Sequence, residues 1–191
     1  MSNPATVTLL ASQVALDNAQ TNKHAAGANA AVASSASREA MTTVLTLSAL
    51  SIALVDNAGV IAHGGKKILD FPKGYISIES VVANLAVTKS SAGVIATFNG
   101  AFSLGSVVAD TGATLTSTEA DIIASTVTPA ATAGVTTANG AKLTATNLDG
   151  TVTPVDMYLN VVVTDTDHDV TATPCNLLFT GTITITWRNM G

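Results

Sequence analysis

Residues 94 to 104 alternate between two kinds of side chain, and this two-residue period recurs through most of the chain after residue 42. One parity is largely apolar: Val94, Ala96, Phe98, Gly100, Phe102 and Leu104. The other is mostly small or polar: Ile95, Thr97, Asn99, Ala101 and Ser103. Successive side chains of a β-strand point to opposite faces, so a strand with one buried and one solvated face gives this pattern. The pattern therefore predicts an all-β fold of antiparallel strands, in a sandwich or a barrel.

The composition indicates one β domain with a core of small side chains. The 191 residues are 47% hydrophobic but only 4% aromatic and 11% charged. Small side chains each bury little area, so a lone monomer would be only moderately stabilised by its core. A surface poor in charge also costs little to desolvate when a neighbour covers it. We therefore expect the chain to bury further surface against partners, including copies of itself in a dimer or trimer.

Charge and cysteine content argue against several classes of protein. The net charge is −5, and the eight Lys and Arg residues are spread along the chain, which argues against a nucleic-acid partner. The basic pair Lys66-Lys67 is expected in a solvated loop or at a strand edge. The single cysteine, Cys175, cannot form an internal disulfide, and we expect a buried or half-buried free thiol.

We expect neither a signal peptide nor a membrane span. The N-terminus has no positively charged segment before its first apolar residues. The uncharged stretch from Ala40 to Val55 is rich in Thr and Ser and too short to span a bilayer comfortably. These features predict a chain that is made and used in a cytosol-like compartment.

The first 41 residues differ from the rest, because they hold twelve alanines and no Phe, Tyr or Trp. Val7 to Gln20 could form a short helix, since alanine favours helices. The run from Thr21 to Ser37 has too little apolar surface to order by itself. We predict an N-terminal arm over residues 1–41, partly helical or extended, that orders on another surface. A β-sandwich domain over residues 42–191 follows it.

Apolar residues change parity within two predicted strands, which indicates a β-bulge in the first and a bend with a change of face in the second. The first change lies near Ala49, between Leu45-x-Leu47 and Leu50-x-Ile52-x-Leu54. The second lies at Glu79-Ser80, in the strand that starts at Ile76. Turns are predicted at residues 56–59 and 72–74.

The remaining elements are two hairpins, a long loop and a final strand. Ser90 to Gly93 is predicted to close a hairpin between strands 81–87 and 94–104. Asp149-Gly150 is predicted to close a second hairpin, between 142–147 and 157–163. Residues 109–141 are weakly patterned and predicted as a long loop, with Ile122-Ile123 as a short strand or helical turn. With a long strand from Leu177 to Arg188, about eight strands result, which favours an antiparallel sandwich of the jelly-roll type.

The acidic cluster Asp165, Asp167 and Asp169 is the first candidate for chemistry. Alternate aspartates resemble the start of a calcium loop, but the glycine and the final glutamate of such a loop are missing. We interpret the cluster as a hydrated loop between strands, with an ion site as the alternative.

No other motif predicts a catalytic, cofactor or metal site. His24, His63 and His168 lie in separate segments without metal-ligand spacing and are expected at the surface. Gly64-Gly65-Lys66 lacks the upstream glycine and the following hydroxyl of a phosphate loop. Glu79 and Glu119 are the only glutamates in the sheet region. Apart from Tyr75 and Tyr158, the aromatic side chains on strands fall on core parities. The sequence thus predicts a protein that is not an enzyme.

Four stretches resemble a group of small virion proteins of tailed bacteriophages. They are Ile68-Leu-Asp-Phe-Pro-Lys-Gly74, Asn147-Leu-Asp-Gly-Thr151, Tyr158-Leu-Asn160 with Asp165 to Asp169, and Asn176 to Trp187. The resemblance spans about residues 50 to 191 and contains no functional signature. It implies a virion structural protein of the capsid decoration or cement type. Such a protein is assembled in the host cytoplasm and binds the major capsid protein on the outer surface of the capsid.

The alanine-rich N-terminus departs from a compact decoration domain but suits an arm laid over adjacent capsid subunits. The alternative hypothesis is a head-fibre or tail-tip module that binds a host receptor or glycan. A tail-associated glycan hydrolase would need paired carboxylates in a cleft, and the spacing of the acidic residues does not indicate such a pair.

Overall fold

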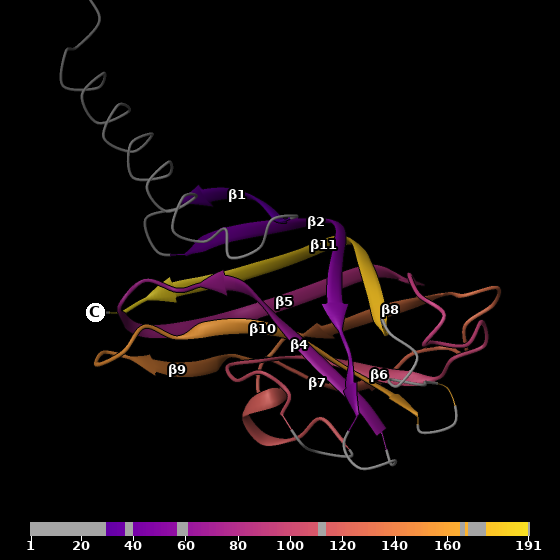
Figure 1. Ribbon diagram of the computed structural model, residues 1–191. Helices are drawn as coiled ribbons and strands as arrows, with labels where there is room; N and C mark the ends of the chain where they lie inside the picture. Colours follow the sequence, from indigo (N-terminus) through magenta and orange to yellow (C-terminus); the bar gives the residue numbers. More distant parts are fainter. Residues whose placement is uncertain are drawn as a thin grey trace, which may run out of the picture.

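Two antiparallel β-sheets packed face to face make up the computed structural model, which describes residues 30–36, 40–56, 61–110, 114–164, 167 and 175–190 (Figure 1). Sheet A contains β1 (Ala30–Ala36), β2 (Met41–Ala53), β5 (Gly74–Lys89), β8 (Val135–Lys142), β9 (Thr146–Gly150) and β11 (Asn176–Asn189). Sheet B contains β3 (Val55–Asp56), β4 (Ile61–Asp70), β6 (Gly100–Gly105), β7 (Ile123–Val127) and β10 (Asp156–Thr164). The connection between β6 and β7 contains a 3-10 turn, η1 (Ser117–Glu119). The predicted all-β sandwich is confirmed.

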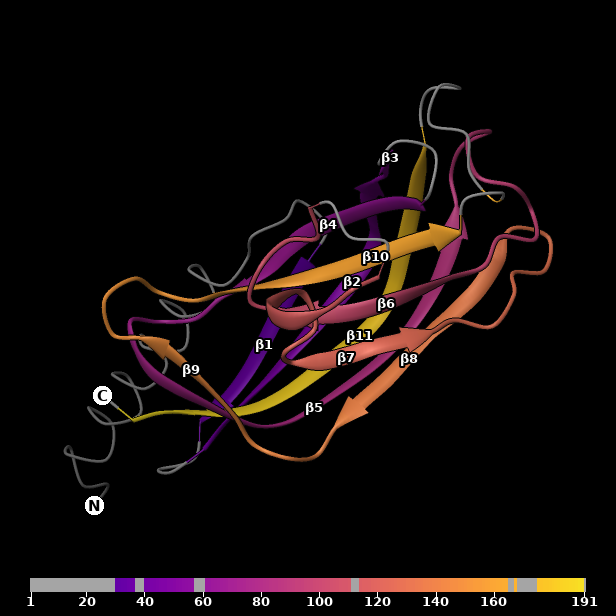
Figure 2. The same ribbon diagram turned by 90° about the horizontal axis from the view of Figure 1, so that it is seen from below.

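The strand order is that of a jelly roll. Sheet A runs β1-β2-β11-β5-β8, with β9 also paired to β5, and sheet B runs β3-β4-β10-β6-β7. Apart from β1 and β3, the strands pair from the outside of the sequence inward. β2 pairs with β11, β4 with β10, β5 with β8 and β9, and β6 with β7. This nested pairing is what a long antiparallel hairpin gives when it is rolled into a sandwich. Figure 2 shows the two layers from below.

The predicted bulge near Ala49 is confirmed, and the predicted change of face at Glu79-Ser80 also arises from a bulge. The two bulges explain the parity changes. Ala49 has a positive φ of 53°, and the register of β2 with β11 shifts at this point. The backbone N–H of Ala49 donates to the Thr180 hydroxyl at 3.2 Å. In β5, Ser80 faces Thr186 while Ile78 faces Trp187, which leaves Glu79 as the extra residue. Each bulge inserts one residue into its strand. The inward positions therefore change sequence parity at the bulge, and the apolar side chains before and after it still point into the core.

The predicted hairpin at Ser90–Gly93 is wrong. Strand β5 lies in sheet A and β6 lies in sheet B, so residues 90–99 cross between the sheets, and β6 begins only at Gly100. Val94 and Phe98 are buried as their parity suggested, but they belong to a loop. The backbone of this loop forms hydrogen bonds with two other segments: Ile95 N–H donates to the Asp167 carbonyl, and the Ala96 carbonyl accepts from Gly134 N–H. The alternation there reflects burial of a connection at the end of the sandwich.

The second predicted hairpin is also wrong, for the same reason. β9 pairs with β5 in sheet A, whereas β10 pairs with β4 and β6 in sheet B. Residues 151–155 therefore form another crossing between the sheets. The predicted long loop over 109–141 instead contains η1, β7 and β8, and Ile123 begins a strand. The long final strand is confirmed as β11.

The core centres on a few large side chains. Trp187 and Phe71 pack edge to face with ring centroids 5.3 Å apart. The indole N–H of Trp187 donates to the buried Thr43 hydroxyl at 2.9 Å, so the buried polar atom of the ring is satisfied. The predicted turn at 72–74 joins β4 to β5.

Of the predicted arm, the structure describes residues 30–36, which form the extended strand β1, and residues 40 and 41 at the start of β2. The predicted helix over Val7 to Gln20 lies outside the described residues, as does the predicted turn at 56–59 beyond Asp56.

Candidate functional site

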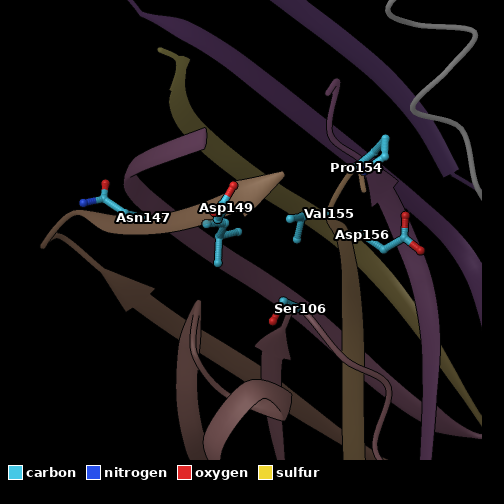
Figure 3. A pocket seen from close by; sticks show the side chains of 7 residues that line it. Ser106, Asn147, Asp149, Pro154, Val155 and Asp156 are labelled. Atoms are coloured by element: carbon cyan, nitrogen blue, oxygen red, sulfur yellow. The ribbon is translucent and has the colours of Figure 1, made fainter. Parts of the chain in front are cut away.

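A cleft of about 380 Å³ lies where β9 leaves sheet A and the chain crosses to β10 (Figure 3). It is lined by Ser106, Asn147, Leu148, Asp149, Pro154, Val155 and Asp156. Figure 3 shows the Asn147 amide and the Asp156 carboxylate on opposite sides, directed away from each other. No aromatic side chain is among the lining residues. The polar groups of this cleft therefore do not converge on a common point.

Beside the cleft, a charge cluster joins β4 to β10. The Lys67 ammonium lies 2.9 Å from the Asp156 carboxylate and 3.5 Å from that of Asp70. The Tyr158 hydroxyl donates to Asp156 at 3.1 Å. The cluster sits where the β4–β10 register shifts, between Met157 and Tyr158.

The environment moves the pKa values of the two carboxyl groups in opposite directions. Partial burial and the hydrogen bond with Asp156 raise the pKa of Asp70 above its usual value. Burial also acts to raise the pKa of Asp156, but hydrogen bonds with Lys67, Asp70 and Tyr158 outweigh it, so this pKa lies below its usual value. A split pair of carboxyls is a feature of acid–base sites. Here Lys67 binds both groups and Asp156 points out of the cleft, so the geometry is that of a brace across a bulge.

The other carboxylate of the cleft, Asp149, closes a local turn. It accepts hydrogen bonds from the backbone N–H of Thr151 at 3.0 Å and from the Thr151 hydroxyl at 2.6 Å. These hydrogen bonds lower the pKa of Asp149. Aspartates in turns commonly accept hydrogen bonds in this way from the residue two positions later.

The sequence analysis missed Asn160, the most buried polar side chain of β10. Its Nδ2 donates to the carbonyls of Val107 and Glu119, both at 2.9 Å, and its Oδ1 accepts from Ala109 N–H at 2.9 Å. These bonds hold the β6–β7 connection against the outer face of sheet B. An asparagine inside the apolar run 157–163 was the available signal, because a polar residue there needs buried partners.

The aspartate cluster at 165–169 is described only at Asp167. Its carboxylate accepts from the backbone N–H of Asn99 at 2.7 Å, from the Asn99 amide at 2.9 Å and from the Thr164 hydroxyl at 3.3 Å. Asp167 thus ties the end of β10 to the 90–99 crossing. Asp165 and Asp169 lie outside the described residues, and so does His168. Within the described part of the chain, no three His, Cys, Asp or Glu side chains gather as a metal site would require.

His63 was expected at the surface, and this is wrong. It lies on β4 with 6% of its surface exposed, and its Nδ1 has no hydrogen-bond partner among the described residues. Its register neighbours are Val55 and Val162, so it is packed among apolar side chains on the outer side of sheet B. His24 lies outside the described residues.

Cys175 is buried, as predicted, and its thiol donates to the Gly93 carbonyl at 3.2 Å. Gly64-Gly65-Lys66 lies within strand β4, which is not the setting of a phosphate loop. A Cβ at Gly65 would meet the Asn160 Oδ1 at 2.3 Å, so the glycine makes room for the Asn160 network.

The outer face of sheet A is uncharged across four strands. We call it the neutral face, and it comprises Thr42, Val44, Thr46, Ser48, Ser51 and Ala53 of β2; Leu178, Thr180, Thr182, Thr184 and Thr186 of β11; Ser80, Val82, Asn84, Ala86 and Thr88 of β5; and Val135, Thr137, Asn139 and Ala141 of β8. None of these side chains is buried. The ion pair of Glu79 with Arg188 lies at one end of the face.

No protein-family model, curated protein or solved structure matches the chain. Among the helices of the described residues, none is long and apolar enough to cross a membrane.

Proposed function

We propose that this protein is a capsid decoration, or cement, protein of a tailed bacteriophage, which binds the major capsid protein on the outer surface of the head and stabilises the shell. The neutral face carries this proposal. Covering Thr, Ser, Ala and Val side chains desolvates no charge, and the centres of protein interfaces are depleted of charged residues. A face of this kind, four strands wide, suits a protein whose function is to pack against other proteins.

The stretches that resemble phage virion proteins support a structural role. Two of them meet at one end of the sandwich, where Gly74 is opposite Gly150. A third joins them there through β10, because Leu69 is opposite Met157, next to Tyr158. Many of the described side chains of these stretches fill the core, brace strands or close turns, and those of β11 alternate between the core and the neutral face. The resemblance therefore rests largely on residues that maintain the fold.

In this proposal the N-terminal arm spreads over adjacent capsid subunits. Strand β1 gives the physical precedent, because residues 30–36 add to the edge of β2 as an extended strand. Backbone pairing of this kind needs an exposed strand edge and little side-chain specificity. Contacts that are individually weak become collectively strong when the same protein repeats across a lattice. The proposal involves no catalytic residue, cofactor, nucleic acid or membrane.

The test compares phage particles made with and without this protein. We expect particles that lack it to rupture at a lower temperature and under milder osmotic shock than complete particles. Adding the purified chain back should restore resistance. Equal resistance of the two kinds of particle would contradict the proposal.

The alternative is a head-fibre or tail-tip module that binds a host glycan, and the cleft of Figure 3 is its best site. Asn147 and Asp149 offer hydrogen-bonding groups there, but the lining has no aromatic platform for a sugar ring. Electron microscopy of the particle separates the two functions. A decoration protein covers the whole shell, whereas a fibre or tail-tip module occurs only at isolated positions.

A further inference from the structure

We propose that the neutral face is where two copies of this chain pack against each other about a two-fold axis. This inference rests on the proposed function, in which the neutral face is covered on the assembled shell, and it names a second copy as what covers it. The N-terminal arm and the remaining surface of the dimer then contact the capsid. Register neighbours show how the face is built. Val44, Thr184, Val82 and Ala141 form one row across four strands, and Thr46, Thr182, Asn84 and Asn139 form the next. A row that is apolar except for Thr184 thus lies beside a row of hydroxyls and amides.

Charge favours a second copy as the occupant. Each chain carries a net charge of −5, so two copies repel each other through most of their surfaces. At the neutral face two copies can approach with no charge on either side. Its hydroxyl and amide groups both donate and accept hydrogen bonds, so the same patch can satisfy itself across a two-fold axis.

The size of the face is compatible with a dimer of moderate affinity. At about 3.3 Å per residue, the run from Leu178 to Thr186 is about 27 Å long, and four strands at about 4.8 Å spacing are about 19 Å wide. Two such faces would bury roughly 1,000 Å², which is near the lower limit for a specific interface. Sheets that pack this way lie about 10 Å apart with their strands roughly aligned. We therefore expect a dimer that dissociates on dilution.

The test is sedimentation velocity of the full-length chain over a wide range of concentration, with two variants at the centre of the face. Thr184→Glu and Thr184→Lys place a charge of either sign on β11, and each should weaken dimerisation at least tenfold, because the charge must be desolvated. The lysine variant is the sharper one. It reduces the net negative charge, so general repulsion alone would make it associate more tightly.

The matched control is Thr118→Glu, at an exposed position on η1 and away from sheet A, which should leave the dimer unchanged. Thermal melting followed by the fluorescence of Trp187, the only tryptophan, checks that each variant is folded. A chain that is monomeric at every concentration would overturn the inference, as would a dimer that both Thr184 variants leave intact. Either result leaves decoration of a shell untouched, because that function is read from the particles.

Discussion

At the scale of single residues, Asn160 links the inner strands to a long surface connection. We expect Asn160→Asp to lower the free energy of unfolding by about 2–4 kcal/mol at neutral pH, because a carboxylate oxygen would face the carbonyls of Val107 and Glu119. Burial would raise the pKa of the new carboxyl above its unfolded value, so the loss should shrink as the pH falls and the group becomes a donor.

Urea unfolding at several pH values, followed by Trp187 fluorescence, measures this effect. The matched control is Asn147→Asp, because Asn147 is exposed at the cleft. A similar loss of stability in both variants would show that the buried hydrogen bonds of Asn160 contribute no more to the free energy of unfolding than the exposed Asn147 does.

Gly181 is a second residue that the fold requires. Its φ is +140°, and a Cβ at this position would lie 2.2 Å from the Asn84 carbonyl oxygen. We expect Gly181→Ala to cost about 2–4 kcal/mol, because it combines backbone strain with a clash against main chain. Gly140→Ala is the control, since its Cβ would meet only side-chain atoms, at 3.0 Å or more. We expect a cost of about 1 kcal/mol there, measured by the same urea titration.

At this scale the sequence was most informative where the core is apolar. Leu45, Leu47, Leu50 and Ile52 are buried as their spacing predicted, because burial on one face forces a period of two and a bulge inverts it. The surface assignment of His63 failed, because His63 lies on the outer side of sheet B and is nevertheless covered there, and the sequence does not show which part of an outer face is covered. Asn160 was visible only as a polar residue in an apolar run.

At the scale of elements, the Lys67 brace predicts an unusual pH dependence. The lowered pKa of Asp156 means that its contribution is present above the unfolded pKa and is lost as the pH falls. The raised pKa of Asp70 has the opposite effect on stability, so its contribution is present at low pH and is lost as the pH rises through the folded pKa. The two contributions partly cancel.

We therefore expect Lys67→Met to cost less than about 1 kcal/mol at neutral pH, since these groups are about one-third exposed. The difference from the unsubstituted chain should shrink as the pH falls and vanish once both carboxyls are protonated, with Asp156 the last to take up its proton because its pKa is lowered. Lys66→Met, at an exposed neighbour, should change stability little at any pH. Chemical unfolding across the pH range measures both, and a cost that persists at low pH would contradict the brace.

Strand existence was easier to predict than strand pairing. The turns before β6 and β10 look like hairpin turns in the sequence, but local turn chemistry does not encode whether the next strand stays in its sheet or crosses to the other. Strand β8 was missed for a different reason. Its inward residues are Thr136, Ala138 and Gly140, which are small because Gly140 packs against Phe102 and Ile123. A strand without large apolar residues leaves no alternation to detect.

At the scale of the whole molecule, the sandwich should fold without β1. When residues 1–36 are removed, β11, β5 and β8 keep all their partners and β2 keeps β11, so we expect the shortened chain to melt cooperatively. It should aggregate more readily, because the edge of β2 loses its partner. Calorimetry and light scattering test the two expectations against the full-length chain. Loss of the cooperative transition would mean that residues 1–36 belong to the folding unit.

The nested strand order also governs how the chain is made. Thr43 and Trp187, joined by a hydrogen bond, are 144 residues apart in the sequence, and β11 inserts between β2 and β5. Strands β2 and β5 therefore each keep one edge unpaired until β11 has been synthesised and has left the ribosome. A chain truncated before residue 176 would keep both edges unpaired and should aggregate.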